Sequence, residues 1–313
     1  MADQEMPLQN GPLEIYAGER PPTPDWFEAA INAPFEEHFL SVGDYKVQYQ
    51  TWGTRGNPGI LFVHGNGAHA HWWDFVAPSF VEAGYYVAAL TFPGMGDSDW
   101  RKSYTMDDFI AQPLAIAEAS GLFDHSEKPI LIAHSFGGFV SVGAISEYGD
   151  RFKQAIIVDS PVVRPDNYEG PKGPPRRNRP NKIYPSLTAA LARFRLAPPQ
   201  PCENHYAMDY IARFSLKEVT DASGNTGWTW KFDPDIWKHF EFKLPAEDVL
   251  RAAKCPVDFV RGASSALVVD AVFEKLETIV PEQTRFVSIE GANHHVMLDK
   301  PLEFIEVIKG LIS

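Results

Sequence analysis

A serine stands at the point where an apolar run of the chain ends and a helical pattern begins. The run 130–134 indicates a buried strand, Ser135 follows it, and two glycines then open the helical pattern. A serine at such a turn is pushed out of the sheet with its hydroxyl exposed. The backbone N–H of Phe136, at the start of the helix, then faces any oxyanion formed beside that hydroxyl. The alternative is a serine that only caps the helix.

Such a serine becomes a nucleophile only when a base takes its proton and a carboxylate orients that base. The candidates are two adjacent histidines, His294 and His295, and two carboxylates, Asp159 and Asp270. Asp159 and His294 lie near the ends of predicted strands, as Ser135 does. Because the carboxyl ends of parallel strands meet at one edge of a sheet, we expect these three side chains to come together there.

The strands that would position these residues are short and wholly apolar, as expected of strands covered on both faces. They alternate with helical patterns, which predicts an α/β fold with a mostly parallel sheet and helices on both faces. An alternating hairpin over 39–52 precedes them, and a helix over 301–312 should close the fold. The predicted buried strands are 60–63, 86–90, 130–134, 155–158, 257–260 and 284–289.

The sheet pattern is interrupted in the second half of the chain. The interrupting segment has helical spacing and no strand alternation, so we expect a helical insertion, which we call the cap. Its basic, proline-rich stretch 171–180 is interpreted as a solvated loop. The expected bounds are 1–37 for an N-terminal arm with a short helix at 26–31, 38–160 and 238–313 for the core domain, and 161–237 for the cap.

The cap carries more aromatic residues than a solvated insertion needs. Some of them must pack against one another, and we expect the remainder to line an apolar or aromatic substrate pocket facing the serine. The residues assigned to this pocket are Tyr206, Tyr210, Phe214, Trp228 and Trp230.

Composition disfavours several classes of partner. The 313 residues carry 41 acidic and 28 basic side chains, a formal net charge of −13, so we expect no nucleic-acid partner. Cys202 and Cys255 lie far apart, which disfavours a disulfide or zinc site and fits a reducing compartment. No signal peptide or bilayer-spanning stretch is visible, so we expect a cytoplasmic protein, monomer or homodimer, without a membrane partner.

The chain resembles the α/β-hydrolase superfamily. Four motifs carry the resemblance, in the order that places nucleophile, acid and histidine along that fold. Ala133 replaces the first glycine of the family's G-x-S-x-G turn, a position that accepts small residues. The motifs are HGNG at 64–67, FPGMGDS at 92–98, AHSFGG at 133–138 and GANH at 291–294.

The resemblance assigns further roles. It implies that the backbone N–H of Asn66, after His-Gly, is the second oxyanion donor beside that of Phe136. The spacing to the acidic residue and proline of the final helix selects His294 as the base. The family's usual acid position follows the strand at 257–260, but the residues there carry no carboxylate and Asp270 lies further on. Asp159, one strand after the nucleophile, is therefore the expected acid.

The resemblance and the serine together imply a serine hydrolase that cleaves a carboxylic ester or lactone through an acyl-enzyme. An aspartate at position 135 would instead indicate alkyl-enzyme chemistry. No metal or organic cofactor is implied, and His69 and His71, without a spaced acidic partner, are expected at the surface or the active-site rim. The alternatives are hydrolysis of C–C bonds in ring-fission products, cofactor-independent dioxygenation, and a non-catalytic ligand receptor.

Overall fold

The structure is a computed structural model, and it describes residues 11–170, 180–221, 223–238, 240–241 and 244–313. The expected loop at 171–180 therefore lies almost wholly outside the described residues. The core is an eight-stranded sheet in the order β1-β2-β4-β3-β5-β6-β9-β10. Its strands are β1 (Glu36–Val42), β2 (Tyr45–Trp52), β3 (Gly59–Val63), β4 (Tyr86–Leu90), β5 (Ile130–His134), β6 (Gln154–Val158), β9 (Val257–Gly262) and β10 (Phe286–Ile289).

The expected mostly parallel sheet is confirmed. Strands β4, β3, β5, β6, β9 and β10 run parallel, whereas β1 and β2 form an antiparallel hairpin that joins the sheet through β2 and β4. The first strand begins at Glu36, so the core starts two residues before the expected bound. Because the six parallel strands share one direction, their carboxyl ends meet along a single edge, where open α/β sheets bind ligands.

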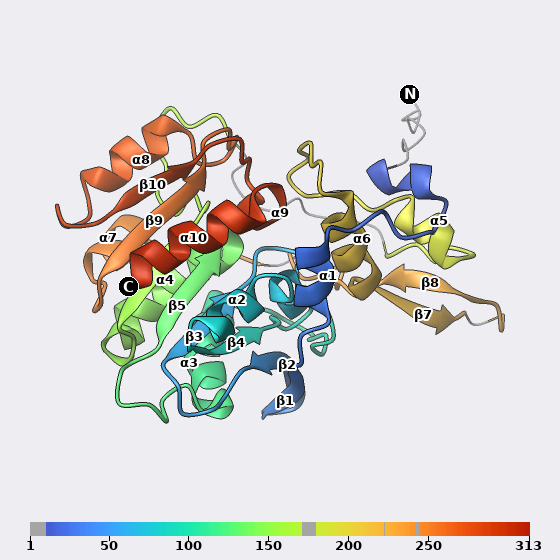
Figure 1. Ribbon diagram of the computed structural model, residues 1–313, viewed down its shortest axis with the longest axis horizontal. Coiled ribbons are helices and arrows are strands. Elements are labelled where there is room, and N and C mark those ends of the chain that lie inside the picture. Colours follow the sequence, from blue (N-terminus) through green and yellow to red (C-terminus); the bar gives the residue numbers. More distant parts are fainter. Residues whose placement is uncertain (1–10, 171–179, 222, 239, 242–243) are drawn as a thin grey trace.

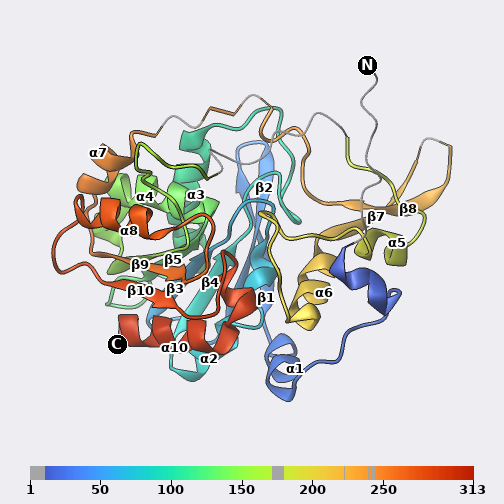
Figure 2. The same cartoon turned by 90° about the horizontal axis from the view of Figure 1, so that it is seen from above.

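Helices cover both faces of the sheet, and the alternation along each strand divides its side chains between two apolar cores. In β3, Leu61 and Val63 pack toward α3, α4, α7 and α8, whereas Ile60 and Phe62 pack toward α2 and α10. Figure 2 shows the two helical layers on either side of the strands. These helices are α2 (Ala77–Glu82), α3 (Met106–Ser120), α4 (Phe136–Tyr148), α7 (Ala246–Arg251), α8 (Asp270–Glu277) and α10 (Pro301–Ile312).

The cap departs from the helical expectation. It contains α5 (Leu187–Leu191) and α6 (His205–Phe214), but also an antiparallel hairpin of β7 (Leu216–Thr220) and β8 (Thr226–Trp230). The prediction of a purely helical cap was therefore wrong. In Figure 1 this hairpin projects at the end of the molecule opposite α8 and β10.

The N-terminal arm packs against the cap. The arm contains the 3-10 helix η1 (Pro12–Tyr16) and α1 (Asp25–Ile31). The backbone N–H of Gly11 donates to the carbonyl of Ala192 at 2.6 Å, and the Arg213 guanidinium donates to the carbonyl of Gly18 at 2.8 Å. The arm and the cap are thus joined by hydrogen bonds at two places.

Candidate active site

Ser135 occupies a strained turn between β5 and α4. Its φ of +54° and ψ of −120° are rare for a residue with a Cβ, and such strain is concentrated at functional sites. The helix starts immediately after it and passes close to β3, because a Cβ at Gly137 would lie 2.4 Å from the carbonyl oxygen of His64. The backbone N–H of Ser135 donates to the carbonyl of Val158 at 2.9 Å, which fixes the turn against the end of β6.

The residue after Val158 is Asp159, and its carboxylate contacts the imidazole of His294. The distance from Asp159 Oδ1 to His294 Nδ1 is 2.7 Å, and both side chains are buried. Two further donors hold the carboxylate, the Ser265 hydroxyl on Oδ1 at 2.7 Å and the Gly262 backbone N–H on Oδ2 at 2.8 Å. Three donors therefore fix the orientation of this carboxylate.

Asp270, the other carboxylate considered, lies elsewhere. Its side chain is 83% exposed and is paired with the Arg261 guanidinium at the start of α8. It has no contact with His294, so the geometry favours Asp159 as the partner of the histidine.

Two hydrogen bonds connect the serine turn to the segments that carry His294 and Asp159. His134, the residue before Ser135, makes a 2.9 Å hydrogen bond from its Nε2 to the carbonyl oxygen of His294. Ser160, the residue after Asp159, donates its hydroxyl to the carbonyl of Ser135 at 2.7 Å. With Nδ1 of His294 donating to the carboxylate, Nε2 keeps its lone pair and can accept a proton.

The two expected oxyanion donors lie at the ends of neighbouring elements. Phe136 is the first residue of α4, and Asn66 lies in the loop after β3. The Asn66 side chain is held by the cap, because the indole N–H of Trp237 donates to its Oδ1 at 3.0 Å.

His64 precedes this loop and remains neutral. Burial lowers its pKa to about 4, although a bond to the carbonyl of Gly65 acts in the opposite direction. Its Nδ1 lies 2.6 Å from that carbonyl, and its Nε2 accepts the N–H of Phe92 at 2.9 Å. A neutral ring with the proton on Nδ1 satisfies both contacts and fixes the start of the loop that carries Asn66.

Three histidines gather around the site. Within the described part of the chain, ring nitrogens of His134, His294 and His295 lie within 4.8 Å of one another, the one group of this kind. Burial is the largest cause that holds the pKa of His134 and His295 well below the ordinary value, and the neighbouring His294 adds to it. Two of these ring nitrogens already have protein partners, because His294 Nδ1 contacts Asp159 and His134 Nε2 contacts the carbonyl of His294.

His69 and His71 were expected at the surface or the active-site rim, and both are buried, so the surface alternative was wrong. His69 Nε2 lies 2.9 Å from the Ser215 hydroxyl and 3.2 Å from the carbonyl of Ile211, which places it between core and cap. His71 Nδ1 pairs with Asp74 Oδ2 at 2.7 Å. His71 also stacks on Phe214 of α6 with ring centroids 3.7 Å apart, so both histidines connect the segment that follows Asn66 to α6.

The structure gives packing contacts for the aromatic residues expected in the pocket. Tyr206 and Tyr210 pack against Phe27 of the arm, with ring centroids 4.7 and 5.8 Å away. Phe214 stacks on His71 at 3.7 Å. Trp228 and Trp230 belong to β8, on the hairpin. These contacts serve the cap–core and arm–cap interfaces, and the substrate role of the five residues stays a prediction.

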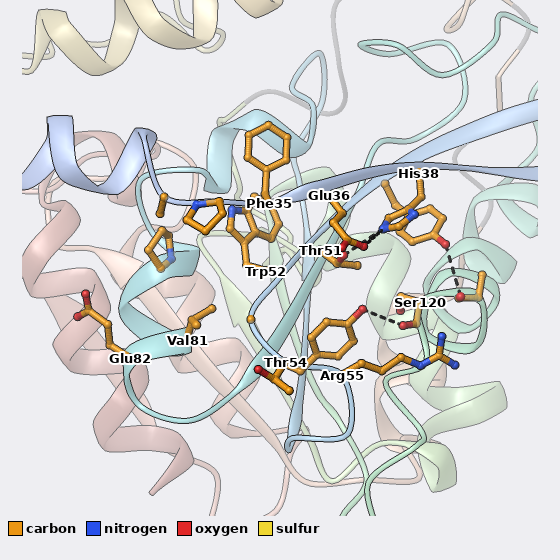
Figure 3. Close-up of a pocket in the computed structure, with 17 residues that line it drawn as sticks. Phe35, Glu36, His38, Thr51, Trp52, Thr54, Arg55, Val81, Glu82 and Ser120 are labelled. Carbon is orange, nitrogen blue, oxygen red and sulfur yellow. Dashed lines mark hydrogen bonds and ion pairs between the residues drawn. The ribbon is translucent and has the colours of Figure 1, made fainter.

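A cavity of about 650 Å³ lies at the other end of the sheet (Figure 3). Phe35, Trp52 and His38 line it together with residues at the ends of β2, α2 and α3. None of the residues of the serine site borders it, so this cavity is distinct from the candidate active site.

Two residues of the site were missed by the sequence reasoning. Ser265 lies after β9, where the resemblance placed the usual acid of the family. Its hydroxyl donates to the carboxylate of Asp159, which follows β6. The absence of an acid at 262–267 was the signal that could have pointed to it. Trp237 carries no local signal, because its contact with Asn66 joins positions 171 residues apart.

Comparisons with known proteins identify the family of the chain. Residues 60–307 match the model of the alpha/beta hydrolase family. The esterase Rv0045c of Mycobacterium tuberculosis is 25% identical over 290 residues, which cover 91% of this chain and 92% of that protein. Epoxide hydrolase 1 of Caenorhabditis elegans is 23% identical over 307 residues, covering 89% of this chain and 70% of that protein.

Solved structures show the same architecture. The thioesterase domain from the curacin biosynthetic pathway superposes with a TM-score of 0.72 at 21% identity, covering 88% of this chain and 99% of that one. The chain therefore belongs to the alpha/beta hydrolase family, and it is a hydrolase. Among its described helices, none has the length and apolar character needed to cross a membrane.

Proposed function

We propose that this protein is a serine esterase that cleaves a carboxylic ester or lactone of moderate size and apolar or aromatic character. The observation that supports the proposal most strongly is the 2.7 Å contact between Asp159 and His294 beside the strained turn of Ser135. The match to esterase Rv0045c over most of both chains supports ester chemistry. The serine at position 135 favours an acyl-enzyme over an alkyl-enzyme.

In the first half of the reaction, Ser135 Oγ attacks the ester carbonyl carbon while His294 Nε2 takes the hydroxyl proton. The carbonyl oxygen becomes an oxyanion and accepts hydrogen bonds from the backbone N–H groups of Asn66 and Phe136. The bond between the carbonyl carbon and the leaving oxygen then breaks, and His294 gives its proton to that oxygen. Asp159 stabilises the imidazolium that exists between these two transfers.

In the second half, water attacks the acyl carbon and gives one proton to His294. The bond between the acyl carbon and Ser135 Oγ breaks, and the proton returns to the serine. The products are a carboxylic acid and an alcohol, or one hydroxy acid when the substrate is a lactone. No redox partner is consumed.

Release of p-nitrophenol from short and medium acyl esters tests the proposal. We expect turnover that Ser135→Ala abolishes, together with loss of the covalent mass shift produced by a fluorophosphonate. Ser146→Ala is the matched control, because this serine lies further along α4 and its hydroxyl donates only to the carbonyl of Gly143. We expect the control to keep wild-type turnover.

Other outcomes would contradict the proposal and point to one of the alternatives. Turnover that survives in Ser135→Ala excludes the acyl-enzyme. Oxygen consumption during cleavage of an aromatic ring would favour a dioxygenase, and tight ligand binding without turnover would favour a receptor.

A further inference from the structure

A single residue of the cap contacts both residues that the proposed mechanism uses as oxyanion donors. The indole N–H of Trp237 donates to Asn66 Oδ1 at 3.0 Å. The same indole packs edge-on against the ring of Phe136, with centroids 5.0 Å apart and an interplanar angle of 75°. Trp237 is 3% exposed, so these contacts are made in a well-packed environment.

The segment that carries Trp237 is fixed to the core on its N-terminal side. We call residues 231–238 the return segment, because the chain leaves the cap through it. The backbone N–H of Asp233 donates to the carbonyl of Gly94 at 2.8 Å, and its carboxylate accepts the Tyr104 hydroxyl at 2.6 Å. Lys231 pairs with Asp97 at 2.5 Å. All these core partners lie in the loop between β4 and α3 or at its end. The backbone N–H of Lys231 also donates to the carbonyl of Ser215, at the end of α6, at 2.9 Å.

Aromatic packing fixes the other side of the indole. The ring of Trp237 lies 5.0 Å from that of Phe240 and 6.2 Å from that of Phe109 on α3. Phe109 in turn packs edge-on against Phe136 at 5.2 Å. The indole therefore has little freedom to leave Asn66, and the hydrogen bond has a rigid donor.

Asn66 lies beyond the part of its loop that His64 fixes, so the indole is a second point of support. Asn66 is half-buried and is followed by Gly67, which is exposed and has a φ of +70°. Oxyanion donors act only when they are held within about 0.5 Å of the required position. A hydrogen bond to the Asn66 side chain restricts the rotation of this residue and so of the backbone N–H that it offers.

We infer that Trp237 is a positioning residue that completes the oxyanion hole, so that the return segment of the cap is part of the catalytic apparatus. This inference rests on the proposed esterase function. It predicts a loss of transition-state stabilisation with little change in substrate affinity, because the oxyanion exists only after the carbonyl has been attacked.

Trp237→Phe is the informative substitution, because phenylalanine keeps aromatic packing against Phe136 and removes only the N–H donor. We expect kcat to fall about tenfold with KM nearly unchanged, less than the ~10²–10³ that removal of an oxyanion donor itself costs. The phosphonylation rate of Ser135 should fall in parallel. Trp26→Phe is the matched control, since Trp26 lies on α1 and packs against Phe27 and Tyr206.

A double-mutant cycle with Asn66→Ala tests whether Trp237 acts through Asn66. Asn66→Ala keeps the backbone N–H and removes the acceptor of the indole. If the inference is right, the double variant Asn66→Ala/Trp237→Phe is no slower than the slower single variant. Multiplied effects would show two independent roles. Equal thermal unfolding midpoints for Trp237→Phe and the wild type keep the result separate from misfolding.

The outcomes separate this inference from the proposed function. If Ser135→Ala abolishes turnover but Trp237→Phe behaves as Trp26→Phe does, the positioning role is wrong and the esterase proposal stands. If Ser135→Ala keeps turnover, both are wrong. A rise in KM with unchanged kcat for Trp237→Phe would make Trp237 a substrate contact and would also overturn the inference.

Discussion

The Ser265 hydroxyl donates a 2.7 Å hydrogen bond to Asp159 Oδ1, the same carboxylate oxygen that contacts the His294 imidazole. Ser265 is buried, and its oxygen also accepts the backbone N–H groups of Leu267 and Val268, each at 3.1 Å. The loop after β9 thus contributes a hydroxyl where the resemblance led us to look for an acid. The Ser265 hydroxyl therefore fixes both the loop after β9 and the carboxylate of Asp159, which follows β6.

Ser265→Ala is expected to lower kcat about three- to tenfold, because Asp159 loses one of three donors and is oriented less well toward His294. Stability should fall by roughly 1–3 kcal/mol, since two buried backbone N–H groups lose their acceptor. Steady-state kinetics and urea unfolding measure the two effects. Ser264→Ala, at the exposed neighbouring position, is the control and should change neither. An unchanged kcat in Ser265→Ala would contradict the positioning role.

Asp159→Asn should cut kcat severely, about 10⁴-fold as in other triads, with the fold intact. An asparagine amide in this place favours the wrong tautomer of His294, so Nε2 no longer accepts the serine proton. Asp270→Asn should leave kcat unchanged, because Asp270 is exposed and pairs only with Arg261. Turnover by the purified variants, with circular dichroism to verify folding, checks this ranking. The reverse ranking would exclude Asp159 as the acid.

Features that depend on a few consecutive residues could be predicted from the sequence. The Ser135 turn was visible because an apolar run meets two glycines there, and Gly137 is required where α4 approaches β3. Asp159 was assigned through the resemblance and the lack of a carboxylate at 262–267, and its contact with His294 agrees with that assignment. The helix at 301–312 was placed correctly, as its strong amphipathic period allows.

Features that depend on distant contacts could not be predicted. The bond between Trp237 and Asn66 joins the end of the cap to the loop after β3, and no local pattern encodes it. The β7–β8 hairpin was missed because its strands are short and partly exposed, although Asp221 accepts backbone N–H groups from Ser223 and Asn225 in its turn. The burial of His69 and His71, which were expected at the surface or the active-site rim, was missed because burial by a second layer of chain cannot be recognised from their own neighbours.

Stability is expected to fall as the pH drops from about 6.5 toward 4. Burial lowers the pKa of His64 to about 4 in the folded protein, below the ordinary 6.5, so the unfolded chain binds the proton more readily across this window. Stability therefore rises with pH between these two values and is fully present above about 6.5. For His64 alone the difference is about 3 kcal/mol.

Urea unfolding at several pH values measures this slope in the wild type and in His64→Gln. The variant should show a shallower slope but not a flat one, because burial also lowers the pKa of His134 and His295. Equal slopes in the two proteins would show that His64 is not the neutral, buried ring that its contacts with Gly65 and Phe92 require.

Tyr210→Phe distinguishes the two roles considered for this cap residue. The Tyr210 hydroxyl donates to Asp74 Oδ2 at 2.6 Å, and burial together with Asp74 raises the pKa of the phenol, so the proton stays on the tyrosine. Asp74 is 1% exposed and otherwise pairs with His71. Removing the hydroxyl leaves a buried carboxylate with one donor fewer, so we expect a loss of roughly 1.5–3 kcal/mol in stability and little change in KM.

Tyr206→Phe on the same helix is the matched control. Its hydroxyl donates to the neutral Asn204 Oδ1 at 2.9 Å, so we expect a smaller loss, about 0.5–1.5 kcal/mol. Urea unfolding and KM for an aromatic ester, measured on both variants, decide between the roles. A raised KM with unchanged stability in Tyr210→Phe would place this side chain in the substrate pocket. A loss of stability with an unchanged KM would instead show that the Tyr210–Asp74 bond fixes α6 on the segment that follows Asn66.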